Sequence, residues 1–395
     1  MDYINRNMGD TLELIHKIFP VITLTGPRQS GKTTLCRHLY PNVPYINLEN
    51  IQTYLLFKEN PVGFLNSFKD GAIIDEAQLE PEIFKALQVI VDEDIHNNNS
   101  RKFIITGSNN FSLMAKISES MAGRTALLTL LPLSINEILN YKNNETLSAS
   151  ELMFMGGYPK VWTNPGSAKD IIIQSYIDTY VEKDLRQLLN VKDLTKFVKF
   201  LGLCAGRTGT ELNRNSLAVE TGVTIATIES WLSVLQTSYI IWLLPPWSTN
   251  INKRLTKSPK LYFYDTGLLC TLLGIKNSKQ LDTYPIKGAI FENLVLNNFV
   301  KRAYNKGEKP KFSFFRDKTG REIDLIIESG VGLRLIEIKS STGFNPDYFK
   351  NIRYFEKTFP DKVISASIIY DGETSDLDNQ KSGIFNFREP FIYDI

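Results

Sequence analysis

Residues 21–34 read VITLTGPRQSGKTT, and the fold is decided in this stretch. The apolar run 21–24 is typical of a buried strand, and residues 35–39 are typical of the start of a helix. Residues 26–33 between them fit the pattern G-x-x-x-x-G-K-[ST] of a phosphate-binding loop. Because strand, glycine-rich turn and helix follow in the order that this pattern requires, the sequence predicts a P-loop. The alternative is a glycine-containing turn with a surface lysine.

The residue types in the loop have a physical reason. Gly26 and Gly31 let the backbone curl so that its N–H groups point at phosphate oxygens, and the following helix adds its positive end. Lys32 would reach the β- and γ-phosphates, and Thr33 would offer its hydroxyl to Mg²⁺. The nucleotide-binding residues predicted for the loop are Gly26, Pro27, Arg28, Gln29, Ser30, Gly31, Lys32, Thr33 and Thr34.

Composition places the chain among ordinary globular proteins. It has 395 residues, which predicts two or three domains, and a hydrophobic fraction of 43%. No apolar run approaches the roughly 18–20 residues of a membrane span, and the N-terminus lacks the apolar core of a signal peptide. Three widely separated cysteines predict neither a disulfide framework nor a zinc site. The expectation is a cytoplasmic protein with reduced thiols and no membrane partner.

The first 131 residues alternate between strand and helix patterns. Strands are predicted over 21–25, 43–47, 71–75, 102–106 and 125–131, and helices over 32–39, 50–59, 82–93 and 110–118. Strict alternation predicts an α/β fold in which helices cover both faces of a parallel sheet.

The third predicted strand ends in two carboxylates, Asp75 and Glu76, as in a Walker B motif. Asp75 would hold Mg²⁺ directly or through water, and Glu76 would polarise the water that attacks the γ-phosphate. An acidic pair at a strand end also arises by chance. Its position behind a complete phosphate loop favours the catalytic interpretation.

Further polar residues are candidates for the same site. Ser108, or its neighbour Asn109, follows the fourth strand, where it would sense or orient the attacking water, unless the segment is only a turn. Arg124 would stabilise charge in the transition state, in cis or from a neighbouring subunit, or else is a surface arginine. Arg6 is a weaker candidate for contact with the nucleotide.

LTGPRQSGKTTL, IIDEAQ, ITGSNNF and GRTALLTLLPLSINE resemble a widespread group of prokaryotic AAA-type ATPases, as do GGYP at 156–159 and YFYDTGL at 262–268. The resemblance implies ATP with Mg²⁺ as cofactor, a winged-helix middle, and a C-terminal domain similar to PD-(D/E)XK nucleases. It implies domains at 1–150, 151–255 and 256–395, DNA as a partner and, by analogy, a homo-oligomer.

A helix-turn-helix pattern lies in the middle, with a short helix from about 216, a turn at Gly222, a second helix over 224–236 and a wing strand over 239–247. The second helix carries no Lys or Arg, whereas a DNA-reading helix normally brings cations to phosphates and base edges. The segment is therefore a DNA reader or a packing module. Basic charge follows it at Lys253, Arg254, Lys257 and Lys260, as a phosphate-contacting edge or a solvated loop.

Residues 322–339, EIDLIIESGVGLRLIEIK, predict two strands, 323–328 and 333–339, around a short turn. In that hairpin, paired residue numbers sum to 661, so Asp324 lies opposite Glu337 and shares a face with Lys339. The two carboxylates would bind Mg²⁺, and Lys339 would stabilise the attacking hydroxide. This matches the D…E-x-K pattern of PD-(D/E)XK nucleases, and that resemblance adds Glu292 as a further metal ligand.

Two functions stay open. The first is an ATP-dependent DNA-processing enzyme in which Glu76 acts on ATP while Asp324, Glu337 and Lys339 cut DNA. The second is a nucleotide-switched DNA- or protein-binding regulator that does not cut. A basic run, residues 301–321 with eight Lys or Arg against two acids, favours contact with phosphodiesters. A P-loop kinase is disfavoured, because the Asp75–Glu76 pair points to attack by water.

Overall fold

A computed structural model describes residues 3–107, 121–143, 145–164, 168–179, 194–250, 257–378 and 382–394. The chain divides into two compact units. The first comprises Met1–Leu133, Thr237–Tyr239 and Ala303–Glu308, and the second comprises Ser134–Gln236, Ile240–Arg302 and Lys309–Ile395. No helix within the described ranges combines the length and the hydrophobicity needed to cross a membrane.

A five-stranded parallel sheet organises the first unit, in the order β2-β3-β4-β1-β5. Its elements are α1 (Gly9–Ile18), β1 (Val21–Thr25), α2 (Lys32–Leu39), β2 (Tyr45–Asn47), α3 (Ile51–Glu59), α4 (Pro61–Asn66), β3 (Gly71–Asp75), α5 (Ile83–His96), β4 (Lys102–Thr106) and β5 (Thr125–Thr129). The predicted α/β sheet is confirmed, although two strands are shorter than predicted. The helix predicted over 110–118 lies outside the described residues.

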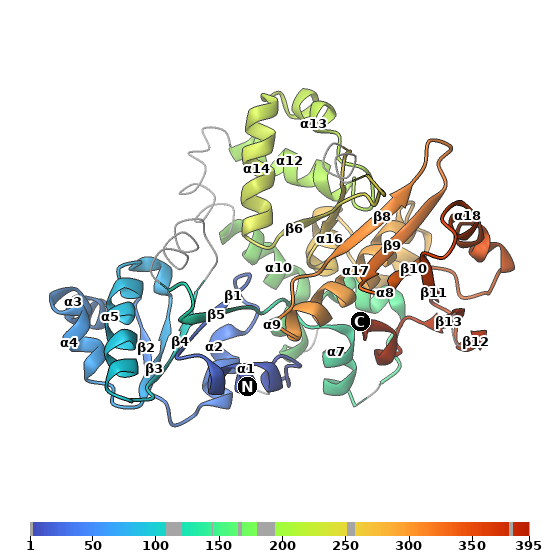
Figure 1. Ribbon diagram of the computed structural model, residues 1–395. Coiled ribbons are helices and arrows are strands. Elements are labelled where there is room, and N and C mark those ends of the chain that lie inside the picture. The colour runs from blue at the N-terminus through green and yellow to red at the C-terminus, as the bar shows by residue number, and fades with distance from the viewer. Residues whose placement is uncertain are drawn as a thin grey trace. The chain divides into compact units, whose positions relative to one another are not determined.

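Alternate residues of the central strands point to opposite faces of this sheet. Ile74 and Ile105 belong to a core that includes side chains of α3, α4 and α5, whereas Ile73 and Ile104 belong to a core with α1 and α2. Figure 1 shows these two groups of helices on either side of the strands. The near-continuous apolar strands follow from this double burial.

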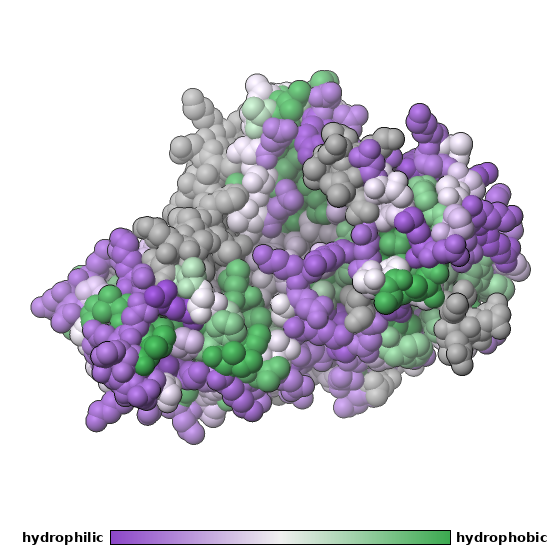
Figure 2. Space-filling view, in the orientation of Figure 1, coloured by the Kyte–Doolittle hydropathy of each residue, from purple (hydrophilic) through white to green (hydrophobic). Residues whose placement is uncertain are grey.

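Apolar side chains also remain at the surface of the first unit. Ile51, Leu55 and Leu56 of α3 are exposed, while Phe57 of the same helix is buried. In Figure 2, apolar patches interrupt a mainly hydrophilic surface. Helix α3 therefore contributes one anchoring side chain to the core and leaves the rest of its apolar residues in contact with solvent.

Helices and a mixed sheet build the second unit. The helices are α7 (Ile135–Tyr141), α8 (Ala149–Met155), α9 (Pro159–Thr163), α10 (Ala168–Thr179), α12 (Leu194–Ala205), α13 (Arg214–Thr221), α14 (Ile225–Thr237), α16 (Thr266–Leu272), α17 (Lys287–Asn305) and α18 (Lys350–Thr358). The strands are β6 (Ile241–Leu244), β7 (Lys260–Phe263), β8 (Phe312–Arg316), β9 (Glu322–Ser329), β10 (Gly332–Lys339), β11 (Val363–Tyr370), β12 (Asp376–Asp378) and β13 (Ser382–Asn386).

The predicted helix-turn-helix is present as α13 and α14, joined at Gly222, whose φ of 67° is the left-handed conformation that glycine adopts without strain. Of the residues predicted as a wing strand, only β6 forms a strand, paired antiparallel with β7, and the winged helix itself stays a prediction. The six-stranded sheet has the order β12-β13-β11-β10-β9-β8. Its β9–β10 pairs, from Gly332–Ser329 to Ile336–Leu325, follow the predicted register.

Three buried asparagines of α17 join the middle segment to the C-terminal segment. Asn293 accepts hydrogen bonds from Thr208 at 2.9 Å and from the backbone of β7, and Asn297 accepts one from Trp242 at 3.0 Å. Asn298 accepts one from the Ile135 backbone at 2.8 Å. These contacts link residues after Ser134 and the middle segment to α17 within the second unit.

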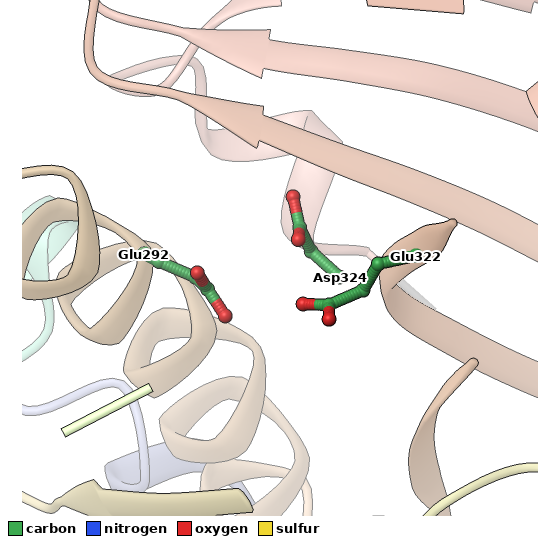
Figure 3. A group of neighbouring side chains, drawn as sticks. All are labelled: Glu292, Glu322 and Asp324. Atoms are coloured by element: carbon green, nitrogen blue, oxygen red, sulfur yellow. The ribbon is translucent and has the colours of Figure 1, made fainter. Parts of the chain in front are cut away.

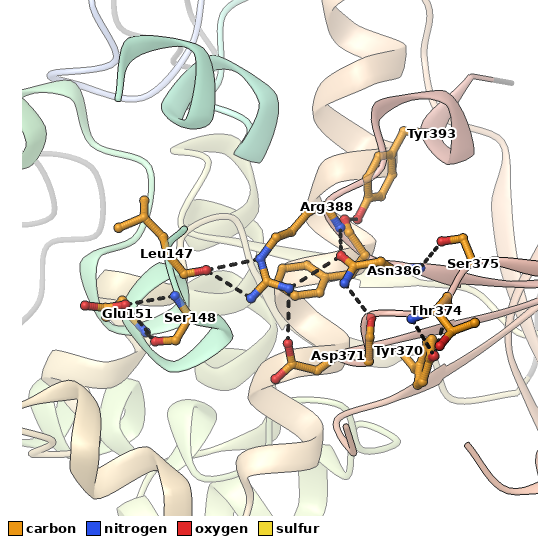
Figure 4. Close-up of polar contacts among 12 residues, drawn as sticks. Leu147, Ser148, Glu151, Tyr370, Asp371, Thr374, Ser375, Asn386, Arg388 and Tyr393 are labelled. Atoms are coloured by element: carbon orange, nitrogen blue, oxygen red, sulfur yellow. Dashed lines mark hydrogen bonds and ion pairs between the residues drawn. The ribbon is translucent and has the colours of Figure 1, made fainter. Parts of the chain in front are cut away.

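Arg388 makes a second connection of this kind (Figure 4). Its guanidinium donates two hydrogen bonds to the Leu147 carbonyl, at 3.1 and 2.9 Å, and one to Asp371 at 3.3 Å. The segment that leads into α8 is thereby attached to the residues that follow β11 and β13. An arginine fork suits this task, because one side chain reaches several acceptors at once.

The two distant family motifs, GGYP and YFYDTGL, meet at Asp265. This buried carboxylate accepts hydrogen bonds from the Gly157 backbone at 2.6 Å and from the Leu268 backbone at 2.8 Å, where it caps α16.

Asp265→Ala would remove the cap and leave the Gly157 N–H unsatisfied. We expect the free energy of unfolding to fall by about 2–4 kcal/mol, measured by urea denaturation. Asn213→Ala, at the exposed cap of α13, should cost only about 1 kcal/mol; equal losses would contradict the role of Asp265.

Candidate functional site

The phosphate loop connects the end of β1 to the start of α2. Gly26 has a φ of +140°, and a Cβ there would lie 2.2 Å from the Leu130 carbonyl oxygen. Gly31 has a φ of +93° and caps α2. Both positions therefore require glycine, and the loop has its backbone N–H groups at the positive end of a helix.

Arg6 stabilises this loop through hydrogen bonds to backbone carbonyls. Its guanidinium donates to the Ser30 carbonyl at 2.7 Å and to the Leu131 carbonyl at 2.6 Å. Arg6 thus joins the loop to the segment after β5. Arg6, the weaker candidate for contact with the nucleotide, here donates two hydrogen bonds to backbone carbonyls of the loop and its neighbour, which favours a supporting role.

Lys32 is buried, and its ammonium donates to the carbonyls of Gly26 at 3.1 Å and of Pro27 at 2.8 Å. Burial lowers the pKa of Lys32 to about 8. Within the described residues, the buried Ser30 hydroxyl has no hydrogen-bond partner. A buried cation and an unsatisfied hydroxyl beside a helix N-terminus fit the phosphates of a nucleotide. Arg28, Gln29 and Thr34 are less buried than Lys32.

Asp75 lies at the end of β3 and accepts hydrogen bonds from three hydroxyl groups. Thr33 and Tyr45 each donate to Oδ2 at 2.7 Å, and Thr106 donates to Oδ1. Thr33 and Asp75 are thus adjacent, as predicted, and their oxygens fit a hard cation such as Mg²⁺. Bound there, Mg²⁺ would neutralise phosphate charge. Tyr45 and Thr106 were not predicted, although both lie on strands that neighbour β3.

Glu76 follows Asp75 with a φ of 57°, which is uncommon for a residue with a side chain. Gln78 donates a hydrogen bond to its carboxylate. Burial raises the pKa of Glu76. A carboxylate held beside the metal ligand, with a raised pKa, suits a general base that accepts a proton from water.

Arg124 does not join this group. It forms an ion pair with Asp92 of α5, with Nε 2.7 Å from Oδ1. Arg124 precedes β5, whose first residue pairs with Val21 at the start of β1. The five residues of β1, roughly 16 Å of strand, therefore separate it from the phosphate loop. This position does not support the role in cis, and a role in a neighbouring subunit stays a prediction. Ser108 and Asn109 lie outside the described residues.

The second candidate site lies on the β9–β10 hairpin. The Asp324 carboxylate accepts from the Ile338 backbone at 2.7 Å, and the Lys339 ammonium lies 3.7 Å from Asp324 and 2.5 Å from Glu337. The predicted convergence of these three residues is present. Burial and the nearby Asp324 raise the pKa of Glu337.

A cluster of three carboxylates, Glu292, Glu322 and Asp324, lies beside it, and their nearest oxygens are within 4.8 Å of one another (Figure 3). Glu292 comes from α17, and the other two come from β9. Glu322 was not predicted, because it lies outside the D…E-x-K pattern, and Glu337 is not part of this group. Burial, with the negative charge of Asp324, raises the pKa of Glu292.

Lys260 of β7 lies within this carboxylate cluster. Its ammonium is 3.1 Å from Glu292 and forms an ion pair with Glu322, and its side chain is only 2% exposed. The earlier expectation that Lys260 belongs to a basic edge or a solvated loop is wrong. Three acidic residues hold it in the interior, where a lone ammonium would be too costly.

Comparison with known proteins divides the chain into three matched segments. Residues 19–139 match a family described as an AAA domain. Residues 146–279 match a domain of unknown function (DUF8612), and residues 287–386 match another (DUF4143). The AAA match contains the phosphate loop, Asp75 and Glu76, and supports ATP binding and hydrolysis by the first unit.

Some relatives align over most of the chain. The uncharacterized proteins Rv2008c of Mycobacterium tuberculosis and Mb2031c of Mycobacterium bovis are each 30% identical over 364 residues, which cover 90% of this chain and 77% of theirs. The uncharacterized protein MJ1544 of Methanocaldococcus jannaschii is 24% identical over 353 residues, which cover 82% of this chain and 75% of that protein.

Two solved structures align with this chain at low sequence identity and with TM-scores below 0.5. The Walker-type ATPase PABY2304 of Pyrococcus abyssi has a TM-score of 0.47 and 16% identity, over 69% of this chain and 96% of its own. The RuvB Holliday junction branch migration motor of Thermotoga maritima has a TM-score of 0.32 and 17% identity, over 64% and 95%. On its sequence identity and coverage, the chain belongs to the family of Rv2008c and Mb2031c, and its first unit is an AAA-type P-loop ATPase domain.

Proposed function

We propose that this protein is an ATP-driven switch whose second unit, built on a nuclease-like core, binds DNA without cutting it. ATP would bind at Lys32 and Thr33, and Glu76 would activate the attacking water. The observation that carries the proposal is the state of the second site, where the ammonium groups of Lys260 and Lys339 already neutralise the carboxylates.

The order of elements supports a nuclease-like core. Helix α17 is followed by the antiparallel strands β8, β9 and β10, then by α18 and by β11, which runs parallel to β10. Together with Asp324, Glu337 and Lys339, this arrangement is similar to that of PD-(D/E)XK nucleases. A fold of this kind supports many functions, so the side chains must decide between binding and cutting.

Charge supports DNA as the partner of the second unit. Lys309, Lys311 and Lys318 are exposed in the basic run around β8. Helix α14, in contrast, has no Lys or Arg with which to read a groove. We therefore place the phosphate contacts near β8 instead of on the helix-turn-helix, and binding should weaken steeply with salt. A homo-oligomer, implied by resemblance alone, stays a prediction.

A second candidate function is Mg²⁺-dependent DNA cleavage. It is favoured by the convergence of Asp324, Glu337 and Lys339, since these residue types in this order would hold a metal ion and stabilise hydroxide. The Lys339 side chain is 30% exposed and has room to move away from Glu337. DNA processing driven by ATP would follow if this site cuts.

A cleavage assay separates the two candidates. Linear, branched and single-stranded DNA would be incubated with Mg²⁺ or Mn²⁺, with and without ATP. We expect no cleavage above background by the wild-type protein, while ATP hydrolysis and salt-sensitive DNA binding are retained. Cleavage that disappears in both Asp324→Asn and Lys339→Ala, with ATP hydrolysis intact, would establish the second candidate and overturn the first.

A further inference from the structure

We infer that Lys260 is a built-in cation that takes the place of a divalent metal ion among Glu292, Glu322 and Asp324. The cluster is then a fixed structural ion-pair network and not a metal site in this protein. The inference rests on the proposed function and deepens it, because it explains why a nuclease-like core would bind DNA without cutting.

The Lys260 ammonium lies where a bound metal ion would lie. The ammonium is 3.1 Å from one oxygen of Glu292, is hydrogen-bonded to Glu322, and feels the charge of Asp324. The three carboxylates whose oxygens approach within 4.8 Å are the same three. A metal ion that bridged them would need the space between these oxygens, at the short distances that Mg²⁺ requires. Ammonium and metal ion therefore exclude each other.

Lys260 also has little freedom to leave this position. Its side chain is 2% exposed, its backbone is paired with Leu244 in the β6–β7 ladder, and its ammonium lies 5.3 Å from the ring centre of Phe314. Lys339, in contrast, is 30% exposed. Displacing Lys260 would require an opening of the surrounding core, whereas the Lys339 side chain already reaches solvent.

Other hydrogen-bonding positions of the three carboxylates are occupied as well. Tyr262, two residues after Lys260 on the same face of β7, donates its hydroxyl to Glu292. Arg316 lies 3.6 Å from Glu322, and the Ile338 backbone donates to Asp324. Buried carboxylates that already have a cation and N–H or O–H donors resemble a satisfied ion-pair network more than a set of metal ligands.

The test measures Mn²⁺ binding to the full-length protein by electron paramagnetic resonance. Asp75→Asn is the parent protein, so that the ATPase site contributes no metal. We expect no saturable Mn²⁺ site in the parent that depends on Glu292 or Glu322. Adding Lys260→Met should create one saturable site whose Mn²⁺ affinity is at least about 100-fold above the residual, non-saturable Mn²⁺ binding of the parent, because an adjacent positive charge is removed. Lys257→Met, which removes an exposed lysine nearby, should create none.

Glu292→Gln and Glu322→Gln complete the design. In the Lys260→Met protein, each should abolish the new site. Mn²⁺ should raise the melting temperature of the Lys260→Met protein but not that of either double variant. A parent protein whose Mn²⁺ site is lost on Glu292→Gln or Glu322→Gln would overturn the inference, as would a folded Lys260→Met protein that gains no site. If Lys260→Met does not fold, the parent and its two glutamine variants decide.

The outcomes also separate this inference from the proposed function. Cleavage that needs Asp324 and Lys339 but is unchanged by Glu322→Gln would defeat the proposed function and leave the role of Lys260 intact. Mn²⁺ bound through Glu292 and Glu322 without cleavage would overturn the role of Lys260 and leave the proposed function intact.

Discussion

Replacing Lys32 with alanine is expected to weaken ATP binding by about 100-fold, because truncating one member of a buried charge pair costs about 3 kcal/mol. The buried ammonium already points at the carbonyls of Gly26 and Pro27 at the base of the loop. With phosphate present, it would supply the charge that the loop backbone lacks. Isothermal titration calorimetry with ATP and Mg²⁺ would measure the change in Kd.

The structure indicates that Lys32→Ala would leave the fold intact. Lys32 is the first residue of α2, and alanine is the best helix former. The melting temperature should therefore change little. Lys17→Ala, at an exposed position of α1, serves as the matched control and should bind ATP normally. An unchanged Kd in Lys32→Ala would mean that the loop does not hold the phosphates through this residue.

Local pattern predicted the parts of the molecule that depend on a few neighbouring residues. The phosphate loop was predictable because two glycines, a lysine and a threonine have fixed spacing between a strand and a helix. The β9–β10 register was predictable because a short turn leaves one way to pair the apolar face. Asp324, Glu337 and Lys339 converge for that reason.

Residues placed by long-range contacts were harder to predict. Lys260 lies in a basic stretch of sequence, and its burial depends on Glu292 and Glu322, which are 32 and 62 positions away. The extent of the second unit depends on contacts of the same kind, because Asn293 and Asn298 bond to segments far from α17 in sequence. Apolar periodicity carries no signal for such polar contacts.

Arg124 differs from these residues, because strand direction alone places it. The phosphate loop follows the C-terminal end of β1, and Arg124 precedes the N-terminal end of β5. Because the two strands are parallel, the loop and Arg124 lie at opposite ends of the strands. The prediction in cis relied on residue type and neglected this geometry. Thr106 could be found by the same reasoning, because it is the last residue of β4, which flanks β3. Tyr45 could not, because it begins β2 and pairs with Ile73.

Glu76→Gln is expected to reduce ATP turnover by about 100- to 10,000-fold, the usual contribution of a general base. Glutamine keeps the size of the side chain and one oxygen for the Gln78 contact, but it cannot accept the proton from water. ATP affinity should remain within about twofold, because the substitution leaves Lys32, Thr33 and Asp75 in place.

Phosphate release in a single turnover would measure the loss of hydrolysis in Glu76→Gln. Nucleotide retention on a filter would show that unhydrolysed ATP stays bound. Glu49→Gln is the matched control, since Glu49 is an exposed carboxylate whose charge acts on Glu76. Its turnover should stay close to that of the wild type. If Glu76→Gln also hydrolyses ATP at a near-normal rate, another group activates the water, and the strained backbone at residue 76 then serves to shape the end of β3 and not to place a base.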